Sequence, residues 1–255
     1  MRAEQLTIAK DKLYRADEGE VRQALNMLAE LGGDPAAQLV VARLRRGLPP
    51  LLVEPSIDTL VLLGQPSAAP ALLELMQHSR APIRKRAAEA LGALGVRSAQ
   101  SALLYALDDP SPEVRAAALG SLGTVGDARA LPALFTATDR GEHAALVAIG
   151  QLARGSDLKA LLSRAPNGEV AGIAPALAGM MGRDKLPLET KLQLVRELEK
   201  LGTPSARTLL VQWLDAFKVK GSPALRKALF DALKRLDALE KEKEKHVVET
   251  TGGKS

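Results

Sequence analysis

Small and apolar residues recur along the chain with a period close to thirty-one residues. Two segments carry the pattern most clearly: IRKRAAEALGALG at 83–95 and VRAAALGSLGTVG at 114–126. The closing glycine recurs at Gly32, Gly64, Gly95 and Gly126, so successive spacings are 32, 31 and 31 residues. Weaker copies end near Ala153, Gly182, Gly202 and Asp237. Self-similarity at this period indicates an array of one repeated supersecondary unit.

Each copy predicts two helices joined by a glycine turn. In the first helix, helix A, the apolar positions are spaced by three and four residues: Ile83, Ala87, Leu91 and Leu94. Such spacing places them on one helical face. The second helix, helix B, repeats its own stripe: Ala68, Leu72 and Met76, then Ala99, Leu103 and Leu107, then Ala130, Leu134 and Thr138. We therefore expect an all-α chain.

Glycine and proline mark the predicted helix ends. A glycine after the last apolar residue can take the left-handed conformation that closes a helix. Start signals follow it at Thr203-Pro204, or precede helix A at Ser111-Pro112, because serine or threonine caps the free amides and proline fits the first turn. A second set of glycines recurs three residues before each unit's end, and we interpret it as close helix packing: Gly92, Gly123, Gly150 and Gly179.

Composition supports helices and excludes several classes of protein. Ala and Leu make up about a third of the chain, aromatic residues are 2%, and there is no cysteine. Disulfides, thiolate catalysis and cysteine-bound zinc are thus excluded. The charged N-terminus and the lack of a long apolar run predict no signal peptide and no membrane insertion. We expect a cytoplasmic protein, and the net charge of +5 fits an ordinary solvated surface.

The segment 108–134, DDPSPEVRAAALGSLGTVGDARALPAL, resembles the HEAT-like repeat first described in phycobilisome lyases. The resemblance implies a right-handed α-solenoid of about seven to eight helix pairs over residues 17–237. A cap helix at 1–16 and a charged, disordered tail at 238–255 would flank it. Three regions depart from the period. Residues 45–56 suggest a proline-broken connection, 140–153 a short unit, and 183–200 a unit without its B helix.

In HEAT-like stacks the B helices line the concave face, which is the usual binding surface. Counting five, six, ten and thirteen residues from each turn glycine gives the expected exposed positions there: Glu74, Gln77, Gln100, Tyr105, Asp108, Leu131, Thr136 and Asp139. Phe135 falls at a core position in this count. Tyr105 is the best single anchor, because tyrosine is enriched at binding hot spots. The sequence thus favours a scaffold or adaptor that binds a protein partner.

No catalytic or cofactor motif accompanies the repeats. The three histidines are far apart in sequence, and His78 suits a helix end as a cation. Asp108, Asp109 and Glu113 flank a helix start, where negative charge is stabilised. We therefore expect no enzyme activity, metal or cofactor. Arginines recur near the start of helix A, and the resemblance implies a ladder in which they pair with the acidic residue after the turn, kept at Asp127 and shifted to Asp34. That position is Gln65, Val96 and Thr203 elsewhere, so we expect an incomplete ladder that leaves some arginines for a partner, with Arg84 and Arg115 paired structurally. The recurring arginines are Arg22, Arg84, Arg115 and Arg226.

Two basic clusters leave a nucleic-acid alternative open. The denser one forms a possible basic patch of Arg80, Lys85, Arg86 and Arg97, together with Arg84, and the other contains Arg43, Arg45 and Arg46. Nucleic-acid sites combine such charge with aromatic stacking. No aromatic cluster lies near either group in sequence, so nucleic acid is disfavoured. A bilin-lyase-like, chromophore-handling protein is a further alternative implied by the resemblance, but no matched catalytic position supports it.

Overall fold

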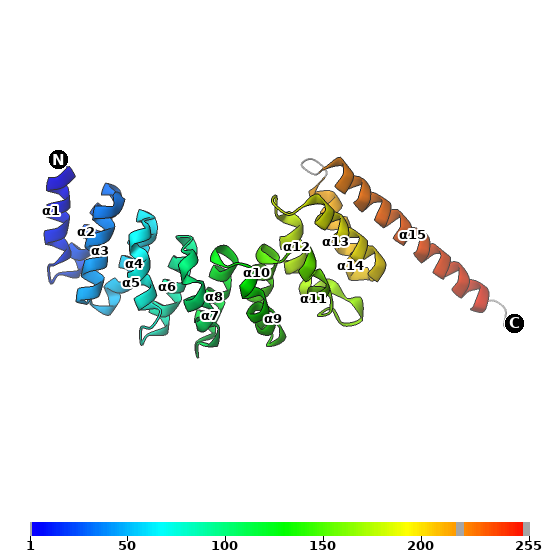
Figure 1. Cartoon of the computed structure of the whole chain (residues 1–255), viewed down its shortest axis with the longest axis horizontal. Coiled ribbons are helices and arrows are strands. Elements are labelled where there is room, and N and C mark those ends of the chain that lie inside the picture. The colour runs from blue at the N-terminus through cyan, green and yellow to red at the C-terminus, as the bar shows by residue number, and fades with distance from the viewer. Residues whose placement is uncertain (1, 218–221, 252–255) are drawn as a thin grey trace. The chain divides into compact units, whose positions relative to one another are not determined.

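The computed structural model describes residues 2–217 and 222–251, with side chains described through residue 242 (Figure 1). All regular structure in this part of the chain is helical, as the repeat pattern predicts. The α-helices are α1 Arg2–Leu13, α2 Glu18–Leu31, α3 Gly33–Arg46, α4 Pro50–Leu63, α5 Ala69–Leu75, α6 Ala81–Ala93, α7 Gln100–Tyr105, α8 Pro112–Val125, α9 Leu131–Asp139, α10 Ala144–Leu152, α11 Leu158–Leu162, α12 Ala174–Gly182, α13 Leu188–Leu201, α14 Pro204–Ala216 and α15 Pro223–Thr251. The short 3₁₀ turns are η1 Pro66–Ala68, η2 Arg97–Ala99, η3 Ala106–Asp108, η4 Ala128–Ala130, η5 Gly155–Asp157, η6 Pro166–Gly168 and η7 Val170–Ile173.

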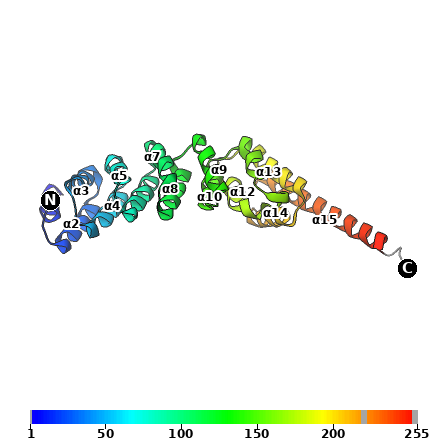
Figure 2. The same ribbon diagram turned by 90° about the horizontal axis from the view of Figure 1, so that it is seen from below.

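The chain divides into two compact units, Met1–Ala148 and Ile149–Ser255. In the first unit the A helices α2, α4, α6 and α8 pack in sequence against one another, and α1 packs on α2. Figure 2 shows α3, α5 and α7 along one edge of this unit and α2, α4 and α8 along the other. The stripes predicted for both helices are buried between the two rows, including Ile83, Leu91, Leu72 and Leu103. The fold is an all-α solenoid.

Most turn glycines adopt the expected left-handed conformation, with φ of +65° at Gly64 and Gly95 and +61° at Gly202. At Gly64 the cap N–H donates to the carbonyl oxygens of Leu60 and Val61, which closes α4. Gly126 differs, with φ −72° and ψ 172°. Its turn is instead fixed by Asp127, whose side chain accepts the Arg129 N–H at the start of η4. The helix pairs therefore use two kinds of turn. One is closed by a left-handed glycine, and the other is fixed by an aspartate side chain.

The proline-rich segment 45–56 was expected to be a connection, and this expectation is wrong for most of it. Only residues 47–49 join α3 to α4, because α4 begins at Pro50 and contains Pro55. Proline at the first helical position loses no hydrogen bond. Pro55 has no N–H for the carbonyl oxygen of Leu51. That oxygen accepts the Arg22 Nη2 at 3.3 Å instead, so a neighbouring A helix compensates for the missing donor.

The predicted packing glycines mark real helix contacts. A Cβ built on Gly92 would lie 2.4 Å from the Ser121 Oγ and 2.9 Å from the Ser121 Cα, so α6 and α8 approach too closely for a side chain. The Ser121 hydroxyl is buried there and donates to the carbonyl oxygen of Ala88 at 2.8 Å. In the second unit a Cβ on Gly150 would lie 3.0 Å from the Gly179 Cα, where α10 meets α12. Alanine-rich helices thus pack almost backbone to backbone.

The second unit is less regular. Helix α12 is followed by α13 with only residues 183–187 between them, so the B helix is missing here, as the sequence indicates. The described residues therefore hold six complete helix pairs, while α12 and α15 have no B helix after them. The helical backbone of α15 continues to Thr251, past the boundary expected at 237, because alternating Glu and Lys are good helix formers. Residues 252–255 of the expected tail lie outside the described part of the chain.

No helix in the described residues is both long enough and apolar enough to cross a membrane.

Candidate partner-binding site

The exposed B-helix positions follow the predicted count in part. Positions ten and thirteen after the turn glycine are exposed in each of three successive repeats: Glu74 and Gln77, Tyr105 and Asp108, Thr136 and Asp139. Tyr105 is the most prominent, with 74% of its surface accessible. Position five fails, because Gln100 is half-buried and Leu131 is only 4% exposed. Short 3₁₀ turns precede these B helices and rotate position five toward the core.

A cleft of about 420 Å³ brings three of the predicted residues together. It lies between the C-terminal ends of α5 and α7, and Gln77, Tyr105 and Asp108 line it. The other lining residues include Met76, His78, Ala102 and Ala106, together with the Arg84–Asp109 pair and Pro110. The cleft thus places one exposed aromatic ring beside an amide, an imidazole and a carboxylate.

Ion pairs connect the B helices on either side of this cleft. Arg45 on α3 donates from both Nε and Nη2 to the Glu74 carboxylate, with the shorter contact at 2.7 Å. Arg140, after α9, donates to the Asp108 Oδ1 at 3.0 Å. Among the described residues no ion pair links α5 to α7. The gap in this row of ion pairs coincides with the cleft and with Tyr105.

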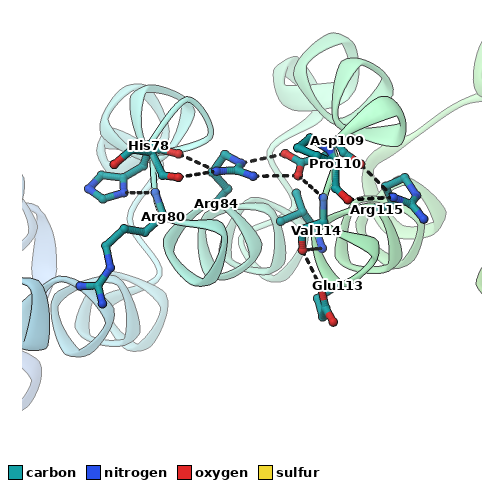
Figure 3. A network of polar contacts seen from close by, with 10 residues as sticks. His78, Arg80, Arg84, Asp109, Pro110, Glu113, Val114 and Arg115 are labelled. Atoms are coloured by element: carbon teal, nitrogen blue, oxygen red, sulfur yellow. Dashed lines mark hydrogen bonds and ion pairs between the residues drawn. The ribbon is translucent and has the colours of Figure 1, made fainter.

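An arginine network forms the wall of the cleft toward the A helices (Figure 3). Arg84 on α6 donates to both carboxylate oxygens of Asp109, at 2.7 and 2.8 Å, and to the carbonyl oxygens of His78 and Ser79. The two charged side chains are only 14% and 10% exposed. The Arg84 guanidinium, together with the Ser111 N–H, lowers the pKa of Asp109 below its ordinary value, although burial opposes this. This pair fixes the loops between successive repeats.

The same arrangement recurs one repeat later. Arg115 on α8 donates to the Glu142 Oε1 at 3.1 Å and to the carbonyl oxygen of Asp109 at 2.9 Å. Arg84 and Arg115 therefore form two successive steps of a ladder, but the expected acidic partner, Asp127, is wrong. Asp127 pairs with Arg129, and the ladder acids lie in the loop before the next A helix. The N-terminal end of helix A lies beside that loop, whereas the A–B turn is at the opposite end.

The remaining candidate residues have structural contacts. Gln100 donates to the Asp127 Oδ1 at 3.1 Å, which connects α7 to the start of η4. His78 accepts the Arg80 N–H at Nδ1, at 3.1 Å. Glu113 accepts the Ser111 hydroxyl at 2.7 Å. The acids at 108, 109 and 113 thus bind three different groups, and the described residues contain no cluster of three His, Asp or Glu side chains that could hold a metal ion.

The possible basic patch is not gathered into one site. Arg80 precedes α6 and Arg97 follows it, so α6, about 20 Å long, separates them. Arg86 pairs with Asp58 and Glu89, and Lys85 lies 3.8 Å from Glu89. The carboxylates of Asp58 and Glu89 thus neutralise Lys85 and Arg86. The sequence does not show the Asp58 contact, because Asp58 lies in another repeat.

The second basic cluster has an aromatic neighbour that the sequence did not reveal. The guanidinium groups of Arg43 and Arg46 lie 5.5 and 5.6 Å from the centroid of the Tyr14 ring. Arg43 also donates to the carbonyl oxygen of Leu13 at 3.0 Å, so its contacts fasten the end of α1 to α3. About thirty residues separate these partners, and only the packing of the cap helix brings them together.

A scan against family models supports the fold. The model described as HEAT repeats matches residues 69–153 and 101–179. The repeats within residues 69–179 are HEAT repeats. The matched range includes the residues that line the cleft and the ion pairs of Arg84 and Arg115. A search of curated proteins found no match.

Solved structures with related folds include two proteins. One comes from the complex of CpcE and CpcF of phycocyanin lyase from Nostoc sp. PCC7120, at 19% identity, a TM-score of 0.50, and coverage of 91% of this chain and 94% of that chain. The other is human deoxyhypusine hydroxylase in complex with glycerol, at 16% identity, a TM-score of 0.45, and coverage of 93% and 97%. At this identity the first likeness concerns the fold alone.

Proposed function

We propose that this HEAT-repeat protein is a non-catalytic scaffold or adaptor that binds a protein partner on its B-helix face, at the cleft between α5 and α7. The observation that carries the proposal is Tyr105, which exposes 74% of its surface beside a cleft of about 420 Å³ in a chain with only 2% aromatic residues. An isolated exposed tyrosine contributes a large contact area with little loss of side-chain entropy on binding. Repeat arrays also commonly use an extended face for binding.

The surroundings of Tyr105 suit a peptide segment of the partner, in a helical or extended conformation. Gln77 offers both an amide donor and acceptor, Asp108 offers acceptors, and Met76 and Ala102 offer apolar contact. The neighbouring pairs Arg45–Glu74 and Asp108–Arg140 hold the adjacent B helices in place. Thr136 and Asp139 continue the same face on α9. A cytoplasmic location, expected from the cysteine-free sequence, belongs to this proposal.

The sequence suggests two other functions: nucleic-acid binding and a lyase-like role. A nucleic-acid partner would need the basic residues to be available, but Lys85 and Arg86 contact Glu89 and Asp58. A lyase-like role for the chain has the fold likeness to the phycocyanin lyase structure as its only support.

Site-specific crosslinking tests the proposal. Because the chain has no cysteine, Gln77→Cys provides one attachment point for a benzophenone maleimide inside the cleft. The matched control is Leu62→Cys on the A helix α4, since Leu62 is 76% exposed. In extracts of the native cell, we expect the label at 77 to give a discrete crosslinked protein that the label at 62 does not give. Identical products at both positions, or crosslinks to nucleic acid only, would refute the proposal.

A further inference from the structure

A second cleft, in the unit formed by residues 149–255, has a different chemical character. It has a volume of about 460 Å³ and lies where the end of α10 faces the loop between α12 and α13. Three of its nine lining residues are cationic, Arg154, Arg183 and Lys185, and none is acidic. The remaining lining residues are Gln151, Leu152, Gly155, Leu186, Pro187 and Thr190.

The central cation is held in place by backbone groups. Arg183 donates to the carbonyl oxygens of Gln151 and Ala153, which close the C-terminal end of α10. A guanidinium has five N–H donors, so other donors remain after these two contacts. Burial and the nearby Arg154 guanidinium lower the pKa of Arg183 from its ordinary value.

Three acidic residues next to this cleft in sequence, Asp157, Asp184 and Glu189, do not line it. Asp184, between Arg183 and Lys185, is exposed. Asp157 accepts the Arg154 N–H at 2.7 Å, in a turn of the backbone. Glu189 pairs with Arg196, two turns further along α13. The positive charge of the cleft is therefore available to a ligand. The cleft lies at the loop 183–187, where no B helix separates α12 from α13.

We propose that this cleft binds a small phosphate monoester. Arg154, Arg183 and Lys185 would contact the phosphate oxygens, because arginine and lysine are the usual phosphate partners in proteins. Thr190 supplies a hydroxyl donor, and Leu152, Leu186 and Pro187 contact an apolar body of the ligand. The volume is within the range of small-molecule sites. The site is separate from the Tyr105 cleft, so it adds a ligand to the scaffold and does not depend on the protein partner.

Calorimetric titration of the full chain with phenyl phosphate tests the site, with benzoate and phenol as ligands that lack the phosphate. We expect phenyl phosphate to bind with a dissociation constant of roughly 1 mM or tighter, and the other two to bind at least about tenfold more weakly. Arg154→Gln and Lys185→Gln should each weaken phenyl phosphate binding about tenfold, the effect of losing one hydrogen bond to a charged group. Neither side chain caps a helix, so both variants should fold.

Lys159→Gln, on the exposed part of α11, is the matched control, because it removes the same charge outside the cleft. It should leave the affinity for phenyl phosphate unchanged. The proposal is overturned if phenyl phosphate does not bind, if benzoate binds equally well, or if Lys159→Gln weakens binding as much as the cleft variants. The last outcome would assign the binding to net charge alone.

Discussion

At residue 92 the absence of a side chain decides how closely two helices can pack. The recurrence of glycine three residues before each unit's end predicts such positions, and Gly92, Gly150 and Gly179 confirm the prediction. The identity of the opposing group could not be predicted, because Ser121 belongs to the next repeat and its contact depends on the crossing of α6 and α8. A hydroxyl in this contact is satisfied by the Ala88 carbonyl oxygen, which no local pattern indicates.

We expect Gly92→Ala to destabilise the protein by about 1–3 kcal/mol, the usual cost of overpacking, even though alanine favours helix. A Cβ at this position would lie 2.7 Å from the Ser121 Cβ and 2.9 Å from its Cα, so moving the hydroxyl alone cannot relieve the contact. Gly120→Ala on α8 is the control, since nothing lies within 4 Å of a Cβ there.

The control should stabilise the protein by up to about 1 kcal/mol through helix propensity. Thermal or urea unfolding of both variants measures the difference. If Gly92→Ala were as stable as Gly120→Ala, the close packing of α6 on α8 would be disproved.

Between elements, arginine ion pairs connect α6 and α8 each to the loop before the next A helix. The resemblance to HEAT-like repeats implies such a ladder at Arg84 and Arg115, but it implies the wrong acid. Asp127 follows the A–B turn, at the far end of the helix from Arg115, whereas Glu142 lies in the next inter-repeat loop. Arg115 is near the N-terminal end of its helix, so its side chain reaches the loop at that end and not the A–B turn. One of the two ladder acids, Asp109, is singled out in the sequence, where it is interpreted as a helix-start charge.

Asp109→Asn should destabilise the protein by about 1–3 kcal/mol at neutral pH, because Arg84 would lose a mostly buried carboxylate partner. Since the folded pKa of Asp109 is lowered, its contribution is present above the unfolded pKa of about 3.9 and is lost as the pH falls below that value. The stability difference between wild type and variant should therefore shrink in acid.

Asp108→Asn is the neighbouring control. The Asp108 side chain is 78% exposed, and its ion pair with Arg140 is solvent-screened, so we expect a change below about 1 kcal/mol. Urea unfolding from neutral to acidic pH checks both variants. Equal effects of the two substitutions, or a difference for Asp109→Asn that does not depend on pH, would contradict the assigned ion pair.

At the scale of the whole molecule, the repeat period predicts the all-α solenoid, because it depends on apolar and small residues that every repeat needs. The irregular parts are harder to predict, since the proline in α4 is accommodated by Arg22 from another helix. The counted register placed Tyr105 correctly on the surface. It could not reveal the cleft beside it, which lies between α5 and α7, where the described residues hold no ion pair like the one that joins α3 to α5.

The central claim is that Tyr105 anchors a protein partner, and the affinity of that partner for Tyr105→Ala tests it most directly. With the protein captured through the label at residue 77, titration should show that Tyr105→Ala weakens binding at least about tenfold, as expected for a hot-spot tyrosine. Leu62→Ala, which removes an equally exposed apolar side chain from the A-helix face, should leave the affinity unchanged. Unchanged affinity for Tyr105→Ala, with weaker binding by Leu62→Ala, would contradict the account and place the partner on the opposite face.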